Sequence, residues 1–263
     1  MKTRALQAKR VAPTGQSVDS PQTGANLVWG ISPEGFSRIV DRHGNRLVVR
    51  KDQIPNIDFS LCQSDADKSD CEPRYYGRVA IRTRALANGH MAVIRPYFHG
   101  GAFRRIMRSW FFTWPPRPFR ELSITEELRL RGLRTVEVYA ACVSRPFGPF
   151  YRAWLITRQL PDAEDLWSAL KSGFAERVGL QRTLRMVAES IAALHREGVY
   201  HPDLNLKNIL LKAEGADLVP YIIDFDKAKV FLGRLPAPLA RKNLARLERS
   251  ARKLDPERQF LTA

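Results

Sequence analysis

The sequence predicts an α+β fold, in which a small β-rich first half is followed by a helical second half. In the first half, short apolar runs are separated by turn residues. The clearest pair, 76–87 and 90–95, flanks Asn88-Gly89, which suits a type I′ hairpin turn. In the second half, apolar residues follow the helical period over 181–197, which predicts an amphipathic helix. With 263 residues, the chain is long enough for one large domain or two lobes.

Strands are expected where a short run of apolar and β-branched residues is bounded by turn residues. Besides the hairpin, such runs cover residues 27–31, 36–40, 47–50, 136–143, 152–157, 209–212 and 219–223. Residues 1–25 are basic and then rich in Pro, Gly, Ser and Gln, so we expect a disordered leader there. The acidic and polar residues 60–72 are expected to form a loop.

Helices are expected where apolar residues keep the helical period up to a stop residue. One covers 121–131 and is stopped by Gly132, and the helix over 181–197 is stopped by Gly198. Two more are expected, one starting within 161–165 and leading to residue 170, and a basic one over 239–254. The segment between the last two helices, 199–226, carries the candidate catalytic residues.

This segment contains three side chains suited to phosphate chemistry: Asp203, Asn208 and Asp224. It reads His-Pro-Asp-Leu-Asn-Leu-Lys-Asn-Ile-Leu from residue 201 and Ile-Ile-Asp-Phe from residue 222. Phosphoryl transfer depends on positioning and charge neutralisation, and Mg²⁺ prefers hard oxygen ligands such as carboxylates and amides. The spacing matches the catalytic loop of protein kinases, where an Asp accepts the proton of the substrate hydroxyl and an Asn and a second Asp hold magnesium. The alternative is a buried loop in which Asp and Asn only cap turns, and the motif leaves open whether His201 is structural or catalytic.

The composition is strongly basic, with 43 Lys and Arg against 27 Asp and Glu, a net charge of +16. Such a charge implies an anionic partner, which can be nucleic acid, an anionic membrane surface or a phosphorylated substrate. Three cysteines without zinc-like spacing favour a reducing compartment over a disulfide framework, although Cys62 and Cys71 could pair. No run of eighteen apolar residues is present, which indicates cytoplasmic residence with a surface-bound state left open.

Residues 104–120 have the most distinctive local composition, with five arginines, five aromatic residues and no acidic residue. Arginine binds phosphate in bidentate fashion, and Trp and Phe favour interfaces, so this segment suits docking onto an anionic lipid surface or a glycolipid. The alternative is an ordinary connection whose aromatic residues belong to the core.

The chain resembles the lipopolysaccharide kinases, and within them the Kdo kinases, which phosphorylate 3-deoxy-D-manno-octulosonic acid (Kdo) on lipid A precursors. The resemblance runs from about residue 75 to 252. The residues that carry it are Arg95, Tyr97, Gly100-Gly101, Phe119, Glu121, Arg131-Gly132-Leu133, 157–166, 201–211, 224–227 and 243–250. It implies a bilobal protein-kinase-like fold, with a β-rich N-lobe over 26–157 and a helical C-lobe over 158–263.

The resemblance also implies the reaction and its partners. The chain would use ATP and Mg²⁺ to transfer the γ-phosphate to a hydroxyl of Kdo in the lipopolysaccharide inner core. The acceptor would be a Kdo-lipid A type glycolipid, met by a cytoplasmic protein bound peripherally to the anionic inner membrane. No nucleic-acid motif is present, so nucleic acid is not expected as a partner. The alternatives are a kinase of core heptose or another small molecule, and a membrane-associated pseudokinase or binding module.

The family's roles map onto individual residues of this sequence. Asp203 would be the catalytic base, and Asn208 and Asp224 would ligate Mg²⁺. Glu121 would hold the phosphate-binding cation, and the backbone around Arg158 to Leu160 would meet the adenine.

Two positions depart from the general kinase pattern. Arg95 stands where general kinases have a lysine, and it either binds the phosphates beside Glu121 or binds a sugar carboxylate while another group meets the phosphates. Asp226 replaces the glycine of Asp-Phe-Gly and would be an additional metal ligand.

Overall fold

The computed structural model describes residues 33–63, 74–76, 79–98, 111, 113, 115–147 and 150–260. The predicted leader over 1–25, the predicted strand over 27–31 and Cys71 lie outside these residues. Within them, Cys62 and Cys142 are free and buried. No helix of the described part has the length and apolar character needed to cross a membrane.

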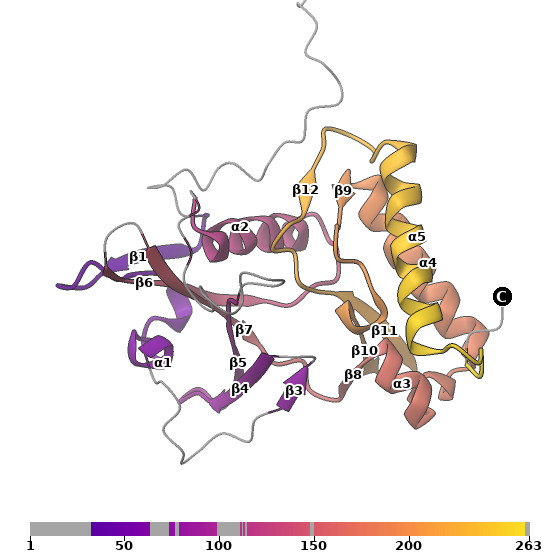
Figure 1. The fold of residues 1–263 in the computed structure, drawn as a ribbon. Helices are drawn as coiled ribbons and strands as arrows, with labels where there is room; N and C mark the ends of the chain where they lie inside the picture. The colour runs from indigo at the N-terminus through magenta and orange to yellow at the C-terminus, as the bar shows by residue number, and fades with distance from the viewer. Residues whose placement is uncertain are drawn as a thin grey trace, which may run out of the picture.

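The first half forms one antiparallel sheet of seven strands (Figure 1), in the order β1-β2-β6-β7-β5-β4-β3. The strands are β1 (Phe36–Val40), β2 (Arg46–Arg50), β3 (Arg74–Tyr76), β4 (Val79–Ala85), β5 (Met91–Pro96), β6 (Val138–Phe147) and β7 (Phe150–Arg158). The central strand β7 pairs with β5 and β6, so it brings the long-range contacts of the sheet together.

Successive side chains of a strand point to opposite faces of the sheet. Both faces carry buried side chains, because a helix packs on each. On one face, Leu155 packs with Leu122 of helix α2 (Arg117–Leu130). On the other, Trp154 and Ile156 pack with Leu61 of the short helix α1 (Ser60–Gln63).

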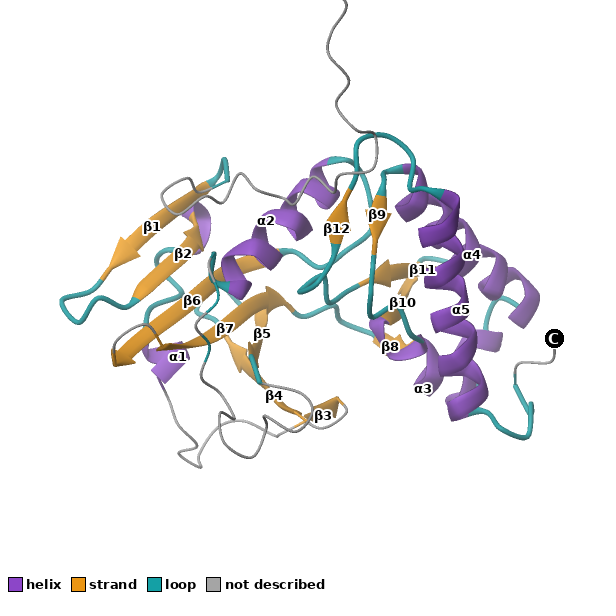
Figure 2. Ribbon diagram, turned by 45° about the horizontal axis from the view of Figure 1, so that its top comes forward, coloured by secondary structure: helices purple, strands orange, loops and turns teal. Residues whose placement is uncertain are grey.

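Helix α2 belongs to two hydrophobic cores. Phe119 and Leu122 lie in the core of the sheet, whereas Ile124 and Leu128 lie in the core of the second half. Figure 2 shows α2 running from the sheet toward β9 and β12. The helix therefore holds residues of the first half against the segment that carries the candidate catalytic residues.

The second half is built around helices, with two small sheets in the orders β11-β10-β8 and β12-β9. Its elements are β8 (Ala163–Asp165), α3 (Leu166–Ser172), α4 (Leu180–Arg196), β9 (Val199–Tyr200), β10 (Ile209–Glu214), β11 (Asp217–Ile222), β12 (Lys229–Val230) and α5 (Ala237–Leu254), with short 3-10 turns between them. Figures 1 and 2 both show α5 alongside α4, on the side of the molecule away from the large sheet. The predicted α+β fold, β-rich first and helical second, is confirmed.

The bounds of several elements differ from the sequence prediction. Helix α2 begins at Arg117, four residues before the predicted start at residue 121. A proline is tolerated in its first turn, because the N–H groups there have no partner within the helix and the N–H that proline lacks is not missed. Residues 163–165 pair with β10 as β8, so α3 begins only at Leu166, capped by Asp165, whose side chain accepts a hydrogen bond from the Ser168 amide. Residues 60–63 are helical rather than a loop.

The hairpin around Asn88-Gly89 forms, but its turn is not type I′. Gly89 has φ 80° and donates to the Leu86 carbonyl, while Asn88 is not among the described non-glycine residues with positive φ. Leu86 in turn donates to the carbonyl of His90, which gives a three-residue loop with a left-handed glycine. The Asn88 side chain accepts from the His90 amide and donates to Gln53, and these contacts favour the longer loop.

Gly198 does more than stop helix α4. It has φ 73°, and a Cβ at this position would lie 2.3 Å from the Gly233 carbonyl oxygen and 2.4 Å from that of Phe231. Only glycine allows the chain after α4 to pass this close to the segment before α5.

Candidate active site

The loop over 201–208 joins β9 to β10, and His201 fixes its start. This side chain is fully buried. Its Nδ1 accepts a hydrogen bond from the Asp203 amide at 3.2 Å, so Nε2 carries the proton and donates to the Ile223 carbonyl at 3.0 Å. Burial lowers the pKa of His201, which keeps the ring neutral. Both nitrogens are engaged, which makes His201 structural.

Asn243 of α5 holds the same loop from behind. It is fully buried, donates to the His201 carbonyl at 2.6 Å and accepts from the His201 amide at 3.2 Å. His195 at the end of α4 lies 3.3 Å from the same Asn243 oxygen. No role was predicted for Asn243, although a polar residue on the apolar face of a helix is a usable signal, since Leu247 and Leu254 of that face pack on the core.

Asp203 presents its carboxylate to solvent, because the loop is held through its backbone. The side chains of Asn205 and Asn208 both donate to the Asp203 carbonyl at 2.8 Å. The Asp203 side chain is 56% exposed, and within the described residues it contacts the side chain of Arg246 of α5 alone, at 3.2 Å. A carboxylate in this position is accessible to an incoming hydroxyl group.

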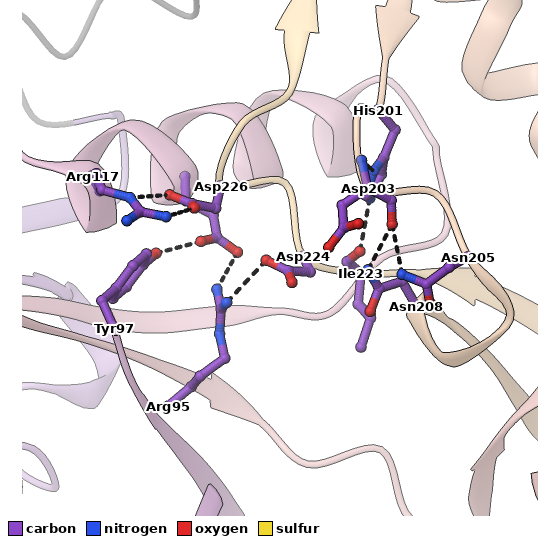
Figure 3. Close-up of polar contacts among 11 residues, drawn as sticks. Arg95, Tyr97, Arg117, His201, Asp203, Asn205, Asn208, Ile223, Asp224 and Asp226 are labelled. Carbon is purple, nitrogen blue, oxygen red and sulfur yellow. Dashed lines mark hydrogen bonds and ion pairs between the residues drawn. The ribbon is translucent and has the colours of Figure 1, made fainter. Parts of the chain in front are cut away.

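Asp224 is placed beside this loop by the residue before it. The Ile223 amide donates to the Asn208 carbonyl at 3.0 Å, and the Ile223 carbonyl accepts from His201. Figure 3 shows Asp203, Asn208 and Asp224 converging around Ile223. Asp224 has φ 70°, a conformation that is strained for a residue with a side chain and that clusters at functional sites.

The donor set of Asn208 and Asp224 fits magnesium. Because Asn208 uses its NH₂ group on the Asp203 carbonyl, its amide oxygen is left for a ligand, and Asp224 commits only one carboxylate oxygen, to Arg95 at 2.9 Å. Burial is the largest single influence on the pKa of Asp224 and would raise it, but the charge and hydrogen bond of Arg95, together with its other cationic neighbours, lower the pKa overall, so the carboxylate is charged. Within the described residues no group of three or more His, Cys, Asp or Glu is arranged as a metal cage. Mg²⁺ at phosphate-transfer sites needs only one or two protein ligands, since phosphates and water supply the rest.

Arg95 links the sheet to this site. From β5, its guanidinium contacts Asp224 on one side and the buried Glu121 of α2 on the other, and Tyr97 donates to the second oxygen of Glu121 (Figure 3). The structure therefore brings Arg95, Glu121 and Asp224 into one network.

Glu121 has a pKa raised to about 7. Burial is the largest cause, Arg95 opposes it, and the charges of Asp224 and Asp226 raise the pKa further. The carboxyl group therefore titrates near neutral pH.

We expect this titration to be visible in the stability of the protein. Since the folded pKa of Glu121 lies above its usual 4.5, the folded state holds the proton more tightly, and this contribution is full below pH 4.5 and lost as the pH rises through 7. Glu121→Gln cannot titrate, so its free energy of unfolding relative to wild type should increase by up to about 3 kcal/mol between pH 4.5 and 7. Urea unfolding of both proteins at several pH values checks this, and a difference that stays constant with pH would contradict it.

Asp226 is engaged by Arg117 at the start of α2. The Arg117 guanidinium contacts both carboxylate oxygens, with Nε to Oδ1 at 2.9 Å, and it lies over the rings of Tyr97 and Phe111. Both oxygens of Asp226 are thus already paired, which gives no support to the additional metal ligand expected from the sequence. The pair instead ties the segment after Asp224 to α2.

Most described residues of the basic aromatic segment, 104–120, are buried or half-buried. Phe111 and Phe119 are buried, Arg117 binds Asp226, and Arg120 donates to the Ala228 carbonyl at 3.1 Å. For these residues the ordinary connection was the better interpretation. Arg104, Arg105 and Arg108 lie outside the described residues.

The linker after β7 is mostly engaged in backbone pairing. The Arg158 amide donates to the Glu137 carbonyl at 2.9 Å, and the Gln159 amide to the Met91 carbonyl at 2.8 Å. Within the described part of the chain, no backbone acceptor is found for the Leu160 amide. Of the predicted adenine contacts, Leu160 is the one with a spare donor.

Comparison with known proteins gives the family. The model of the lipopolysaccharide kinase (Kdo/WaaP) family matches residues 73–262. The 3-deoxy-D-manno-octulosonic acid kinase of Vibrio vulnificus strain YJ016 is 34% identical over 165 residues, 62% of this chain and 65% of that protein. That of Xanthomonas oryzae pv. oryzae strain PXO99A is 35% identical over 167 residues, 62% of each chain. Among solved structures, WaaP in complex with acyl carrier protein has 22% identity and a TM-score of 0.45, over 70% of this chain and 73% of that one.

An exposed aspartate beside an Asn and Asp pair, with a cation paired to a buried glutamate behind it, is typical of kinase-like folds, in which the cation is usually a lysine and is here Arg95. Because the family match extends over more than half of its residues, the chain belongs to the lipopolysaccharide kinase (Kdo/WaaP) family. It spans 65% and 62% of the length of the two curated relatives described above.

Proposed function

We propose that this protein is an ATP-dependent kinase that transfers the γ-phosphate to a hydroxyl of Kdo in the lipopolysaccharide inner core. The observation that carries the proposal is the exposed Asp203 carboxylate beside Asn208 and Asp224, in a chain similar to proteins named as Kdo kinases. A binding module without chemistry has no need to keep these three groups together.

In this mechanism, the acceptor hydroxyl approaches Asp203, which takes its proton as the oxygen attacks the γ-phosphorus and ADP departs. The loop backbone holds Asp203 in place through Asn205 and Asn208, so the carboxylate is positioned before the acceptor arrives. Asn208 and Asp224 would hold magnesium, which neutralises phosphate charge when bound.

Arg95 is assigned to the phosphates. It already contacts Asp224, the proposed metal ligand, and the buried Glu121 orients it from behind. Its fork of N–H donors suits phosphate oxygens, and its pKa is raised well above the usual value by its two carboxylate neighbours despite burial, so it stays charged. The Leu160 amide is assigned to the adenine.

The proposal is tested by phosphate transfer from labelled ATP to a Kdo-bearing lipid A precursor, compared with the same precursor lacking Kdo and with a heptose-bearing core acceptor. Transfer that requires Kdo supports the proposal. Transfer only to the heptose acceptor would contradict Kdo as the acceptor and would make the protein a heptose kinase.

We further propose that the protein works at the cytoplasmic face of the inner membrane, bound peripherally to anionic lipid. The net charge of +16 supports this, since each well-placed Lys or Arg contributes on the order of 1 kcal/mol at an anionic surface. We expect replacement of Arg104, Arg105 and Arg108 by alanine to reduce sedimentation with anionic vesicles severalfold, with little change in turnover on a soluble Kdo acceptor. Equal loss of both would place these arginines in the active site instead.

A further inference from the structure

Helix α5 contacts the catalytic loop through one stripe of residues. Asn243, Arg246 and Ser250 are spaced by three and four positions, so they lie on the same side of the helix. Asn243 binds the backbone of His201, and Ser250 accepts from the Leu206 amide at 3.3 Å. These two contacts fix the backbone of the loop, whereas Arg246 reaches the exposed side chain of Asp203.

Arg246 uses only part of its hydrogen-bonding groups in the contact with Asp203. A guanidinium has five N–H donors, and one nitrogen contacts Asp203, at 3.2 Å. The side chain is 45% exposed, and among the described residues Asp203 is its only polar partner. The remaining donors can therefore bind an anion beside Asp203.

Arg246 differs in this respect from the other arginines of the site. Arg95 pairs with Glu121 and Asp224 and is assigned to the phosphates, and Arg117 pairs with both oxygens of Asp226. Arg246 instead comes from α5, in the second half of the chain, and meets Asp203 where the carboxylate is exposed. The acceptor hydroxyl must arrive at that carboxylate.

Asn205, two residues after Asp203, cannot supply this contact. Its amide nitrogen donates to the Asp203 carbonyl and its oxygen accepts from the Lys207 amide at 2.9 Å, so the side chain is turned into the loop. Among the described residues, the charged donor in contact with the Asp203 side chain is Arg246 of α5.

We propose that Arg246 is an acceptor-binding residue that recognises the carboxylate of a sugar acid. The inference rests on the proposed function, because 3-deoxy-D-manno-octulosonic acid carries such a carboxylate at neutral pH. When the acceptor hydroxyl reaches Asp203, the Arg246 guanidinium turns from the single contact with Asp203 to a bidentate pair with the acceptor carboxylate. It thereby offsets the repulsion between an anionic acceptor and the Asp203 carboxylate, and it favours sugar acids over neutral sugars.

The experiment compares two acceptors with the full chain: a Kdo-bearing lipid A precursor, and the same compound with the Kdo carboxyl group reduced to a hydroxymethyl group. For Arg246→Ala, we expect KM for the carboxylate acceptor to rise by about tenfold to a hundredfold. KM for ATP should be unchanged, and KM for the reduced acceptor should change little. Arg246→Lys keeps the charge but loses the bidentate geometry, so its KM for the carboxylate acceptor should lie between those of wild type and Arg246→Ala. Arg252→Ala is the matched control, because Arg252 is an exposed arginine of the same helix α5 and pairs with Glu248 instead of Asp203.

The outcomes separate this inference from the proposed function. Transfer by wild type, with Arg246→Ala unchanged on both acceptors, would overturn the role of Arg246 alone. An equal fall in kcat on both acceptors, with KM unchanged, would make Arg246 a positioning residue for Asp203 and also overturn the inference. No transfer by wild type to either acceptor, with Mg-ATP bound, would overturn the proposed function and the inference with it.

Discussion

Replacing Asp203 with alanine is expected to lower the rate of phosphate transfer by about a hundredfold to ten-thousandfold, the range that a positioned general base contributes. The Kd for Mg-ATP should stay within a few-fold of wild type, because the variant removes the proton acceptor and keeps Asn208 and Asp224. The loop should keep its shape, since the hydrogen bonds within the loop use the backbone of residue 203, and the carboxylate contacts only the exposed Arg246 among the described residues. Single-turnover transfer and nucleotide titration measure the two quantities.

Asp217→Ala provides the matched control for this variant. Asp217 is an exposed aspartate paired with an arginine, Arg182, at 2.6 Å, as Asp203 is paired with Arg246. It should show wild-type turnover. If Asp203→Ala keeps turnover within about tenfold of wild type, Asp203 is not the base.

Asp224→Ala is expected to raise the Kd for Mg-ATP by about tenfold to a hundredfold, the second large effect. The lost interaction is that of a charged carboxylate with the metal, and Asn208 alone supplies no negative charge. Isothermal titration of ATP with and without Mg²⁺ measures it.

The titration without Mg²⁺ is the control that isolates the metal. Removing a carboxylate near the phosphates reduces repulsion, so the variant should bind metal-free ATP at least as tightly as wild type. If the variant loses affinity equally with and without Mg²⁺, Asp224 acts on the nucleotide pocket as a whole and not through the metal.

The sequence predicted the parts of the site that are close together along the chain. Asp203 and Asn208 lie on one loop, and Asp224 follows the next hairpin, so their spacing along the chain was enough to predict that the three side chains lie together. It also predicted the helices that carry a clear apolar period, such as 181–197. The predicted bounds of helices were wrong where strand pairing with a distant segment overrides the local sequence pattern. Residues 163–165, for example, pair with β10 instead of starting a helix.

The parts that the sequence did not reveal depend on contacts between distant segments. Arg117 reads as one cation of a basic segment, and only the fold brings it to Asp226. In the sequence, Asn243 and Arg246 are polar residues of a basic helix, and only the packing of α5 brings them to the loop over 201–208. The lobe boundary between residues 157 and 158 stays a prediction.

The most direct test of this account is mass spectrometry of a Kdo-bearing lipid A precursor after incubation with the protein, ATP and Mg²⁺. We expect one or more added phosphates, located on the Kdo unit by fragmentation, and none with Asp203→Ala. An unmodified precursor, with Mg-ATP binding intact, would contradict Kdo as the acceptor, and a protein that binds no nucleotide would contradict the kinase itself.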